Sequence, residues 1–102
     1  MIGVISFLND ENCETLAECV FVDEVKIDSE HYTIRCLVKI EDVVMQVKPF
    51  TNIEGITNGA LTKDEAAKVM ENIKLAIRQK DIIDFKRFGE EILDYRTQRE
   101  DA

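Results

Sequence analysis

The sequence predicts an α+β domain: a four-stranded antiparallel meander (ββββ), followed by two C-terminal helices that pack on one face of the sheet. Three observations support this prediction. Apolar and polar residues alternate through residues 31–49, two apolar stretches precede that segment, and apolar residues recur at helical spacing between residues 62 and 95. Strands that come first and helices that follow are typical of α+β architecture.

All 102 residues are expected to form a single domain, because a chain of this length can build one modest core. A composition of 45% hydrophobic and 33% charged residues is typical of a globular protein. We predict a sheet in residues 1–50, a connecting loop in residues 51–61, a helical pair in residues 62–95 and a frayed tail in residues 96–102.

Residues 2–8 are a short apolar run that predicts the first strand, and the polar residues 9–14 predict the turn after it. No basic region precedes this run, so it does not resemble a secretory signal peptide. No apolar run in the sequence approaches the ~20 residues that a membrane span requires. The three cysteines form no CxxC spacing and are expected to be free thiols. We therefore expect a cytoplasmic protein.

Residues 16–27 predict the second strand, in which Asp23 interrupts an otherwise apolar face. In strict register with the third strand, the Asp23 carboxylate would point into the core, where burial is unfavourable. A β-bulge at Asp23 and Glu24 would avoid this burial and would bring Val20 and Val22 inward. We favour the bulge over the strict register.

Residues 31–49 predict a hairpin formed by the third and fourth strands. The apolar residues are mainly even-numbered before Glu41 and Asp42 and odd-numbered after them. A two-residue turn needs this switch, because directly paired residues share a face of the sheet. The predicted pairs are Ile40 with Val43, Lys39 with Val44, Val38 with Met45, Leu37 with Gln46, Cys36 with Val47 and Arg35 with Lys48.

The connection after the hairpin contains Gly55 and Gly59 as turn residues, and links of this length are often functional or mobile. Thr62 and Glu65 predict a capping box at the start of the first helix. The apolar residues behind the cap recur at the spacing of one helix face. They are Ala66, Met70, Ile73 and Ile77.

The rest of the helical region is either a second helix capped by Asp81 or the continuation of one long, kinked helix. We favour a break near Lys80 and Asp81, because the apolar face of the first segment does not continue smoothly into the second. Gly89 is unfavourable inside a helix and predicts close approach to a neighbouring backbone. From Arg96 onward there is nothing to bury, so fraying is expected.

The net charge of −8 argues against direct binding to nucleic acid, which requires a basic surface, and against docking on an anionic membrane. Most of this charge lies in residues 1–30, which hold eight acids and one base, Lys26. We predict that these acids form a partner-binding surface, with an ordinary solubilising surface as the alternative. They are Asp10, Glu11, Glu14, Glu18, Asp23, Glu24, Asp28 and Glu30.

No metal site, cofactor or catalytic residue is predicted. His31 and Cys36 are the closest pair of potential ligands in the strand region, but their opposite parity places them on opposite faces of one strand. The spacing between Cys13 and Cys19 is not that of a zinc site. We therefore expect Cys36 to pack in the core.

These features predict a small acidic, non-enzymatic protein-binding module that acts as an inhibitor, adaptor or assembly factor. Its expected partner is another protein, basic or nucleic-acid-binding, and the eight acids could imitate the spacing of DNA phosphates. A homodimer is also expected, because the strands leave a sheet edge to cover. Small acidic chains are common among phage and mobile-element proteins, which is an association of composition alone.

Two alternatives remain open at the level of the sequence. The first is a small enzyme or ligand-binding domain with a pocket between the sheet and the 50–61 connection, lined by His31, Arg35 or Glu54. The second is a structural subunit of a larger particle or assembly, which would bind its neighbours in fixed stoichiometry.

Overall fold

The computed structural model describes residues 2–100 of the chain, and the elements follow the predicted order with one addition. The strands of the meander come first, and two helices follow with a short strand between them. The elements are β1 (Gly3–Leu8), β2 (Glu14–Lys26), β3 (Tyr32–Ile40), β4 (Val43–Val47), the 3₁₀ turn η1 (Thr57–Gly59), α1 (Lys63–Gln79), β5 (Ile83–Asp84) and α2 (Phe85–Glu100).

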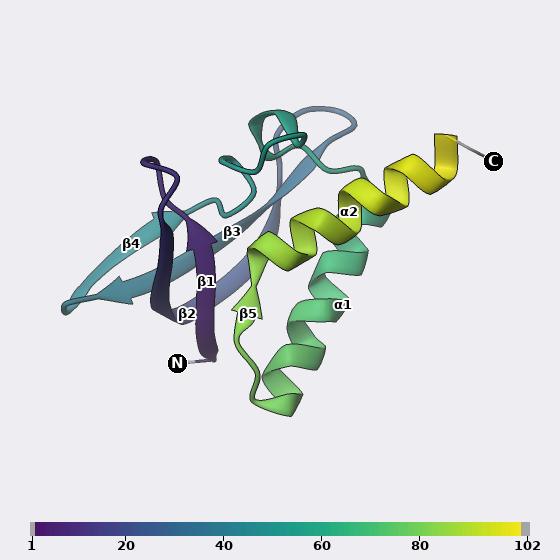
Figure 1. The fold of residues 1–102 in the computed structure, drawn as a ribbon. Helices are drawn as coiled ribbons and strands as arrows, with labels where there is room; N and C mark the ends of the chain where they lie inside the picture. Colours follow the sequence, from purple (N-terminus) through teal and green to yellow (C-terminus); the bar gives the residue numbers. More distant parts are fainter. Residues whose placement is uncertain (1, 101–102) are drawn as a thin grey trace.

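The five strands form one sheet in the order β4-β3-β2-β1-β5. The first four strands are antiparallel neighbours, and β5 runs parallel to β1. Figure 1 shows both helices beside β1 and β5, while the β3–β4 hairpin extends away from them. The predicted α+β class, an antiparallel meander with two C-terminal helices packed against it, is confirmed. The fifth strand is an addition to the prediction.

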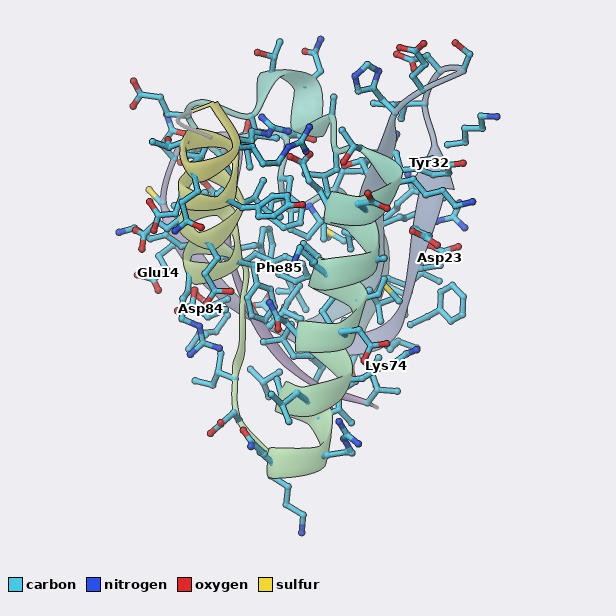
Figure 2. All side chains as sticks on the ribbon, turned by 90° about the vertical axis from the view of Figure 1, so that its right-hand side faces the viewer. Glu14, Asp23, Tyr32, Lys74, Asp84 and Phe85 are labelled. Carbon is cyan, nitrogen blue, oxygen red and sulfur yellow. The ribbon has the colours of Figure 1, made fainter. Side chains whose placement is uncertain are left out.

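The core lies between the sheet and the helices. Phe85, at the start of α2, packs edge-to-face against Phe50 and Phe88, with ring centroids 5.4 and 5.7 Å apart. Figure 2 shows Phe85 between the two helices. The buried residues that α1 contributes share one face of the helix, which differs from the predicted face because Met70 and Ile77 are only partly buried. The buried apolar residues are Ala66, Val69, Ile73 and Ala76.

The β3–β4 hairpin has the predicted register, and its five ladder pairs run from Ile40 with Val43 to Cys36 with Val47. Glu41 and Asp42 form the turn, with φ angles of 50° and 66°. Positive φ at both central residues matches the right-handed twist of the strands, so the hairpin closes without glycine. The predicted pair of Arg35 with Lys48 is wrong, because the ladder ends at Val47.

The second strand contains a β-bulge, although at a different residue from the predicted one. The register between β2 and β3 shifts between Cys19 and Phe21, so Val20 is the additional residue. The predicted location at Asp23 and Glu24 is wrong. An earlier bulge keeps Cys19 in the core and changes the parity of every β2 residue that follows.

The bulge at Val20 decides which residues of the second half of β2 face the helices. Val22 lies opposite Cys36 and packs against the core, as predicted, whereas Val20 is exposed, contrary to the prediction. Asp23 lies opposite Arg35 on the other face of the sheet. There its carboxylate gains a cationic partner, which the strict register, with Asp23 opposite Cys36, does not provide.

The connection between the sheet and α1 is packed into the core. Phe50, Ile56 and Leu61 are all buried. Leu61 also pairs with Tyr32 through two backbone hydrogen bonds of 2.7 and 2.8 Å, which continue the ladder of β3 after β4 has ended. The connection therefore forms part of the structural core, and not an open loop.

The predicted break between the helices is confirmed, but a different residue caps the second helix. Lys80 ends α1 in the left-handed conformation, with a φ of 58°. The prediction of a second helix capped by Asp81 is wrong, because Asp81 does not cap α2. Instead the Asp84 carboxylate accepts hydrogen bonds from the backbone N–H groups of Lys86 and Arg87, at 3.2 and 3.3 Å.

Strand β5 places the start of α2 against the sheet. Ile83 lies opposite Ile5 of β1 and is fully buried, so this short strand adds one core residue between two helices. Gly89 of α2 lies close to Ile53, because a Cβ at that position would be 3.0 Å from the Ile53 side chain. The predicted approach to a neighbouring backbone is wrong, because the close neighbour is a side chain.

The predicted frayed tail is wrong for residues 96–100. Helix α2 continues to Glu100, and Arg96 forms an ion pair with the buried Glu65. The prediction failed because the carboxylate that Arg96 binds lies on another helix. Residues 101–102 of the predicted tail lie outside the described residues.

Replacing Lys80 with glycine is expected to stabilise the protein. A left-handed backbone is strained for lysine and unstrained for glycine, so Lys80→Gly should raise the free energy of unfolding by about 0.5–1 kcal/mol. Urea denaturation at 25 °C measures the change. The control is Gln79→Gly in the helix itself, which should lower the free energy by about 0.5–1 kcal/mol. Equal destabilisation by both variants would contradict the left-handed cap.

Candidate functional site

The eight acids of the predicted partner-binding surface lie on β2 and on the two turns that flank it. Seven are exposed and Asp23 is half-buried. The β1–β2 and β2–β3 turns both lie at the upper side of the molecule in Figure 1. Figure 2 shows Glu14 and Asp23 on opposite sides of that view. The acids are therefore spread around the sheet and do not form one continuous patch.

Asp23 is neutralised by Arg35. The guanidinium donates from Nε at 3.0 Å and from Nη2 at 2.6 Å to the two carboxylate oxygens, which is the bidentate geometry that arginine favours. This hydrogen bonding raises the pKa of Arg35. Both side chains are about one-third exposed. Asp23 therefore contributes little negative charge to a surface that a basic partner could meet.

Asp28 is held within its own turn. Its carboxylate accepts a hydrogen bond from the backbone N–H of Glu30 at 2.8 Å and lies 2.9 Å from Nδ1 of His31. The Glu30 N–H, followed by His31, lowers the pKa of Asp28. This carboxylate stabilises the turn between β2 and β3 and is already engaged by local donors.

The other six acids form no ion pair within 4 Å among residues 2–100. They are Asp10, Glu11, Glu14, Glu18, Glu24 and Glu30. Glu14 accepts a hydrogen bond from the Ser6 hydroxyl at 2.9 Å, and Asp10 accepts one from the Asn52 side chain at 3.2 Å. These are neutral donors, so both carboxylates keep their charge available to a partner.

The sheet face that points away from the helices carries exposed apolar side chains. We call this the open face and define it by Val4, Leu16, Glu18, Phe21, Lys39 and Val44. Leu16 is 61% exposed and lies between Glu14 and Glu18 on the same side of β2. The open face thus presents an apolar residue flanked by two carboxylates that form no ion pair.

A polar cleft of about 490 Å³ lies where the connection meets both helices. Its lining residues are His31, Thr57, Ala60, Thr62, Glu65, Arg96 and Arg99. Of the residues predicted to line a pocket beside the connection, only His31 lies here. Arg35 binds Asp23, and Glu54 lines a different hollow along the connection itself.

Glu65 is the buried acid of this cleft, with a side chain that is 1% exposed. Oε2 accepts from Arg96 Nε at 2.8 Å, and Oε1 accepts from Arg96 Nη2 and from the Thr62 backbone N–H, both at 2.9 Å. Burial opposes ionisation of Glu65, but these hydrogen bonds outweigh it, so the pKa of the carboxyl lies below its usual value. Arg96 also donates to the carbonyl of Ala60 at 2.9 Å.

These bonds show what the cleft can do chemically. Both oxygens of Glu65 are occupied, so this carboxylate joins the helices and the connection and is not available as an acid or base. The basic groups that remain at the rim are His31 and Arg99. Nδ1 of His31 lies 2.9 Å from the Asp28 carboxylate, and the hydroxyl groups of the lining are those of Thr57 and Thr62.

Two of the three cysteines lie in the core, and the third lies in the β1–β2 turn. Cys19 and Cys36 are fully buried on neighbouring strands, which confirms the prediction for Cys36, and Cys13 lies in the exposed β1–β2 turn. A hydrogen bond to Cys19, together with burial, raises the pKa of Cys36. Within residues 2–100, no group of three or more histidine, cysteine, aspartate or glutamate residues is placed to hold a metal ion.

Comparisons with protein-family models, with curated proteins and with solved structures found no match to this chain. Across residues 2–100, no helix is both long and apolar enough to span a bilayer.

Arg96 is the residue of the cleft that the sequence interpretation missed. A signal for it exists, because Phe88, Ile92 and Arg96 are four residues apart and therefore share one helix face. Phe88 and Ile92 are buried. An arginine that continues a buried apolar face requires an acidic partner. Glu65, the third residue of α1 and a member of its capping box, is this partner.

Removing the Arg96 cation is expected to destabilise the fold strongly. Arg96→Met leaves the Glu65 carboxylate buried without its partner, which should lower the free energy of unfolding at pH 7 by about 3 kcal/mol. Arg99→Met is the control, because Arg99 is exposed at the same cleft, and it should change the value by about 0.5 kcal/mol or less. Similar losses in both variants would contradict the structural role of Arg96.

The contribution of the Glu65–Arg96 pair is expected to depend on pH. Because the pKa of Glu65 is lower in the folded protein than its usual value of 4.5, the pair stabilises the fold above that value. The stabilisation is lost as the pH falls through the folded pKa. Urea denaturation of the wild type and of Arg96→Met should therefore show their largest difference near pH 7 and a smaller one below about pH 4. A difference that is constant with pH would contradict an ionised Glu65.

Proposed function

We propose that this protein is a non-enzymatic protein-binding module that acts as an inhibitor, adaptor or assembly factor on a basic partner. The observation that carries the proposal is Leu16, which is 61% exposed between Glu14 and Glu18 on a sheet face without helices. Leu16 shares this face with the exposed side chains of Val4 and Phe21, and exposed apolar residues grouped beside charged ones are typical of interaction sites on soluble proteins.

The charge of the chain supports a basic partner. A net charge of −8 attracts positively charged surfaces over several ångströms, and six of the eight N-terminal acids form no ion pair among residues 2–100. Complementary charge of this kind accelerates association and selects among partners. Nucleic-acid-binding proteins carry such basic surfaces, so duplex DNA is the natural competitor.

The proposed contact centres on the first half of β2 and the turn before it. Asp23 is paired with Arg35 and Asp28 accepts a hydrogen bond within its own turn, so both are left out of it. The acids that remain near Leu16 in the sequence are Asp10, Glu11, Glu14 and Glu18. Glu24 and Glu30 lie beyond the bulge at Val20, on the other half of β2 and its turn.

A ligand-binding function in the cleft is the second candidate. It is favoured by one observation, the cleft of about 490 Å³ with His31 and Arg99 at its rim. The Arg99 guanidinium would attract an anionic small molecule, with the His31 ring beside it. His31→Ala separates the candidates, because it should abolish binding of an anion in the cleft and leave binding to a basic protein unchanged.

A triple variant tests the main proposal. Glu14→Gln, Leu16→Ser and Glu18→Gln together remove two charges and the exposed leucine, and the matched control is Glu71→Gln, Leu75→Ser and Glu90→Gln on the exposed surfaces of the helices. Tagged proteins are used to capture partners from the source cells at low and high salt. The wild type and the control should retain a basic protein at low salt, whereas the β2 variant should retain about tenfold less.

Salt and DNA provide the further readouts of this experiment. Screening of exposed charges should release the partner at high salt. Duplex DNA should compete with the tagged protein for the partner and so release it. Equal capture by the β2 variant, or full retention of the partner at high salt, would contradict the proposal.

A further inference from the structure

Strand β4 is an edge strand that lacks the usual protection against pairing with another chain. It is the outermost strand on one side of the sheet, and Val43, Val44 and Met45 are 56%, 55% and 43% exposed. Its sequence, VVMQV, contains no charged residue and no proline, and its ladder with β3 has no bulge. Native proteins normally protect a sheet edge with one of these features.

The opposite edge of the same sheet is protected. Strand β5 has only two residues, Ile83 and Asp84, and α2 begins directly after it. A strand so short offers almost no backbone groups to a second chain. The two edges therefore differ, and only β4 presents a full strand to solvent.

The hairpin determines which backbone groups of β4 are available. In a two-residue hairpin, the pair next to the turn is hydrogen-bonded, and hydrogen-bonded and non-bonded pairs then alternate. Val43, Met45 and Val47 consequently direct their N–H and C=O groups toward β3. Val44 and Gln46 direct theirs outward, so a second strand must pair through these two residues.

We propose that two copies of this chain pair antiparallel through β4, with the two-fold axis at Met45. Val44 of each copy then faces Gln46 of the other, which forms four backbone hydrogen bonds across the interface. Met45 lies opposite Met45 of the second copy in a non-bonded pair, where side chains approach most closely. The two sheets join into one sheet of ten strands.

In this register, the residues around β4 of one copy are complementary to those of the other copy. Val43 lies opposite Val47 of the second copy, and Asp42 lies opposite its Lys48. The acid–base pair occurs twice because of the two-fold symmetry. Two neighbouring antiparallel registers also pair the outward backbone groups, with the two-fold axis at Val44 or at Gln46. Neither of them places Asp42 opposite a basic residue.

The pairing would also cover apolar surface that the helices leave exposed. Val43, Met45 and Val47 lie on the sheet face that carries the helices. In Figure 1 the tip of the β3–β4 hairpin, where β4 begins, lies far from both helices. In the dimer, the three side chains from each copy form one apolar row across the two-fold axis, which explains why an edge strand carries so apolar a sequence.

This dimer goes beyond the proposed function and is independent of it. It uses none of the acids of residues 1–30 and no residue of the β1–β2 turn. Loss of partner capture with an intact dimer, and loss of the dimer with intact capture, are therefore separate results.

Analytical ultracentrifugation of the full chain over a range of concentrations tests the proposal. The wild type should change with concentration from the monomer mass of 11.7 kDa to twice that mass. Met45→Lys brings two like charges together at the two-fold axis and should raise the dimer dissociation constant about tenfold or more. Leu75→Lys is the matched control, because Leu75 is equally exposed, at 43%, on α1, and it should leave the constant unchanged.

Charge exchange tests the register. Lys48→Glu places two acids opposite each other at both ends of the interface, and Asp42→Lys places two bases there, so each variant alone should be mainly monomeric. In an equimolar mixture, the lysine introduced into one variant chain faces the glutamate introduced into the other, and the mass of the dimer should be restored. Thermal unfolding of each variant verifies that its fold is intact.

Three outcomes would overturn the proposal: a wild type that stays monomeric at all concentrations, a dimer that Met45→Lys does not weaken, and a mixture of the charge variants that stays monomeric. A wild-type monomer that instead binds a strand of a different protein along β4 would also overturn it, because the occupant would then not be a second copy.

Discussion

The ion pair between Glu65 and Arg96 holds the C-terminal half of the molecule together. Glu65 belongs to the cap of α1, Arg96 belongs to the last turns of α2, and the same guanidinium binds the Ala60 carbonyl of the connection. A buried carboxylate is unfavourable without a cation and further hydrogen bonds. The need to satisfy one polar group therefore constrains two helices and the segment between sheet and helix, and it shapes the cleft beside them.

The bulge at Val20 has a comparable effect on the sheet. Before the bulge, Glu14, Leu16 and Glu18 share the open face, and after it Asp23 meets Arg35 on that same face. One additional residue thus decides that Asp23, and not Glu24, lies opposite Arg35 and is neutralised on this face. The surface charge of this protein is a consequence of strand register as much as of composition.

The helices cover one end of the sheet and leave the other uncovered. Helix α2 packs on β1 and α1 packs on β2, β3 and β5, whereas the tip of the β3–β4 hairpin extends beyond both helices (Figure 1). The molecule consequently has two uncovered surfaces of different chemistry. The first half of β2 combines acids with an exposed leucine, and β4 offers backbone groups and valines. Each surface suits a different kind of contact, so partner binding and self-association need not compete.

The elements that the sequence predicted correctly depend on neighbouring residues. The β3–β4 register follows from the parity switch at Glu41 and Asp42, because the side-chain period of a strand is two. The cap formed by Thr62 and Glu65 and the helix break at Lys80 follow from local patterns of the same kind. The eight N-terminal acids were identifiable from composition, but composition could not separate Asp23, which is paired with Arg35, and Asp28, which is held within its own turn.

The tertiary structure decided the features that join distant parts of the chain. Strand β5 exists because Ile83 meets Ile5, and the bulge lies where it brings Asp23 to Arg35. Arg96 is ordered because it reaches Glu65, which is 31 residues away in sequence. By itself, the sequence determined the four strands of the meander, the two helices and the ends of α1, because hydrogen-bonding patterns and apolar periodicity act over a few residues. Only the folded chain decided which charges are paired and which are exposed, because burial makes an ion pair necessary and only packing brings its two members together.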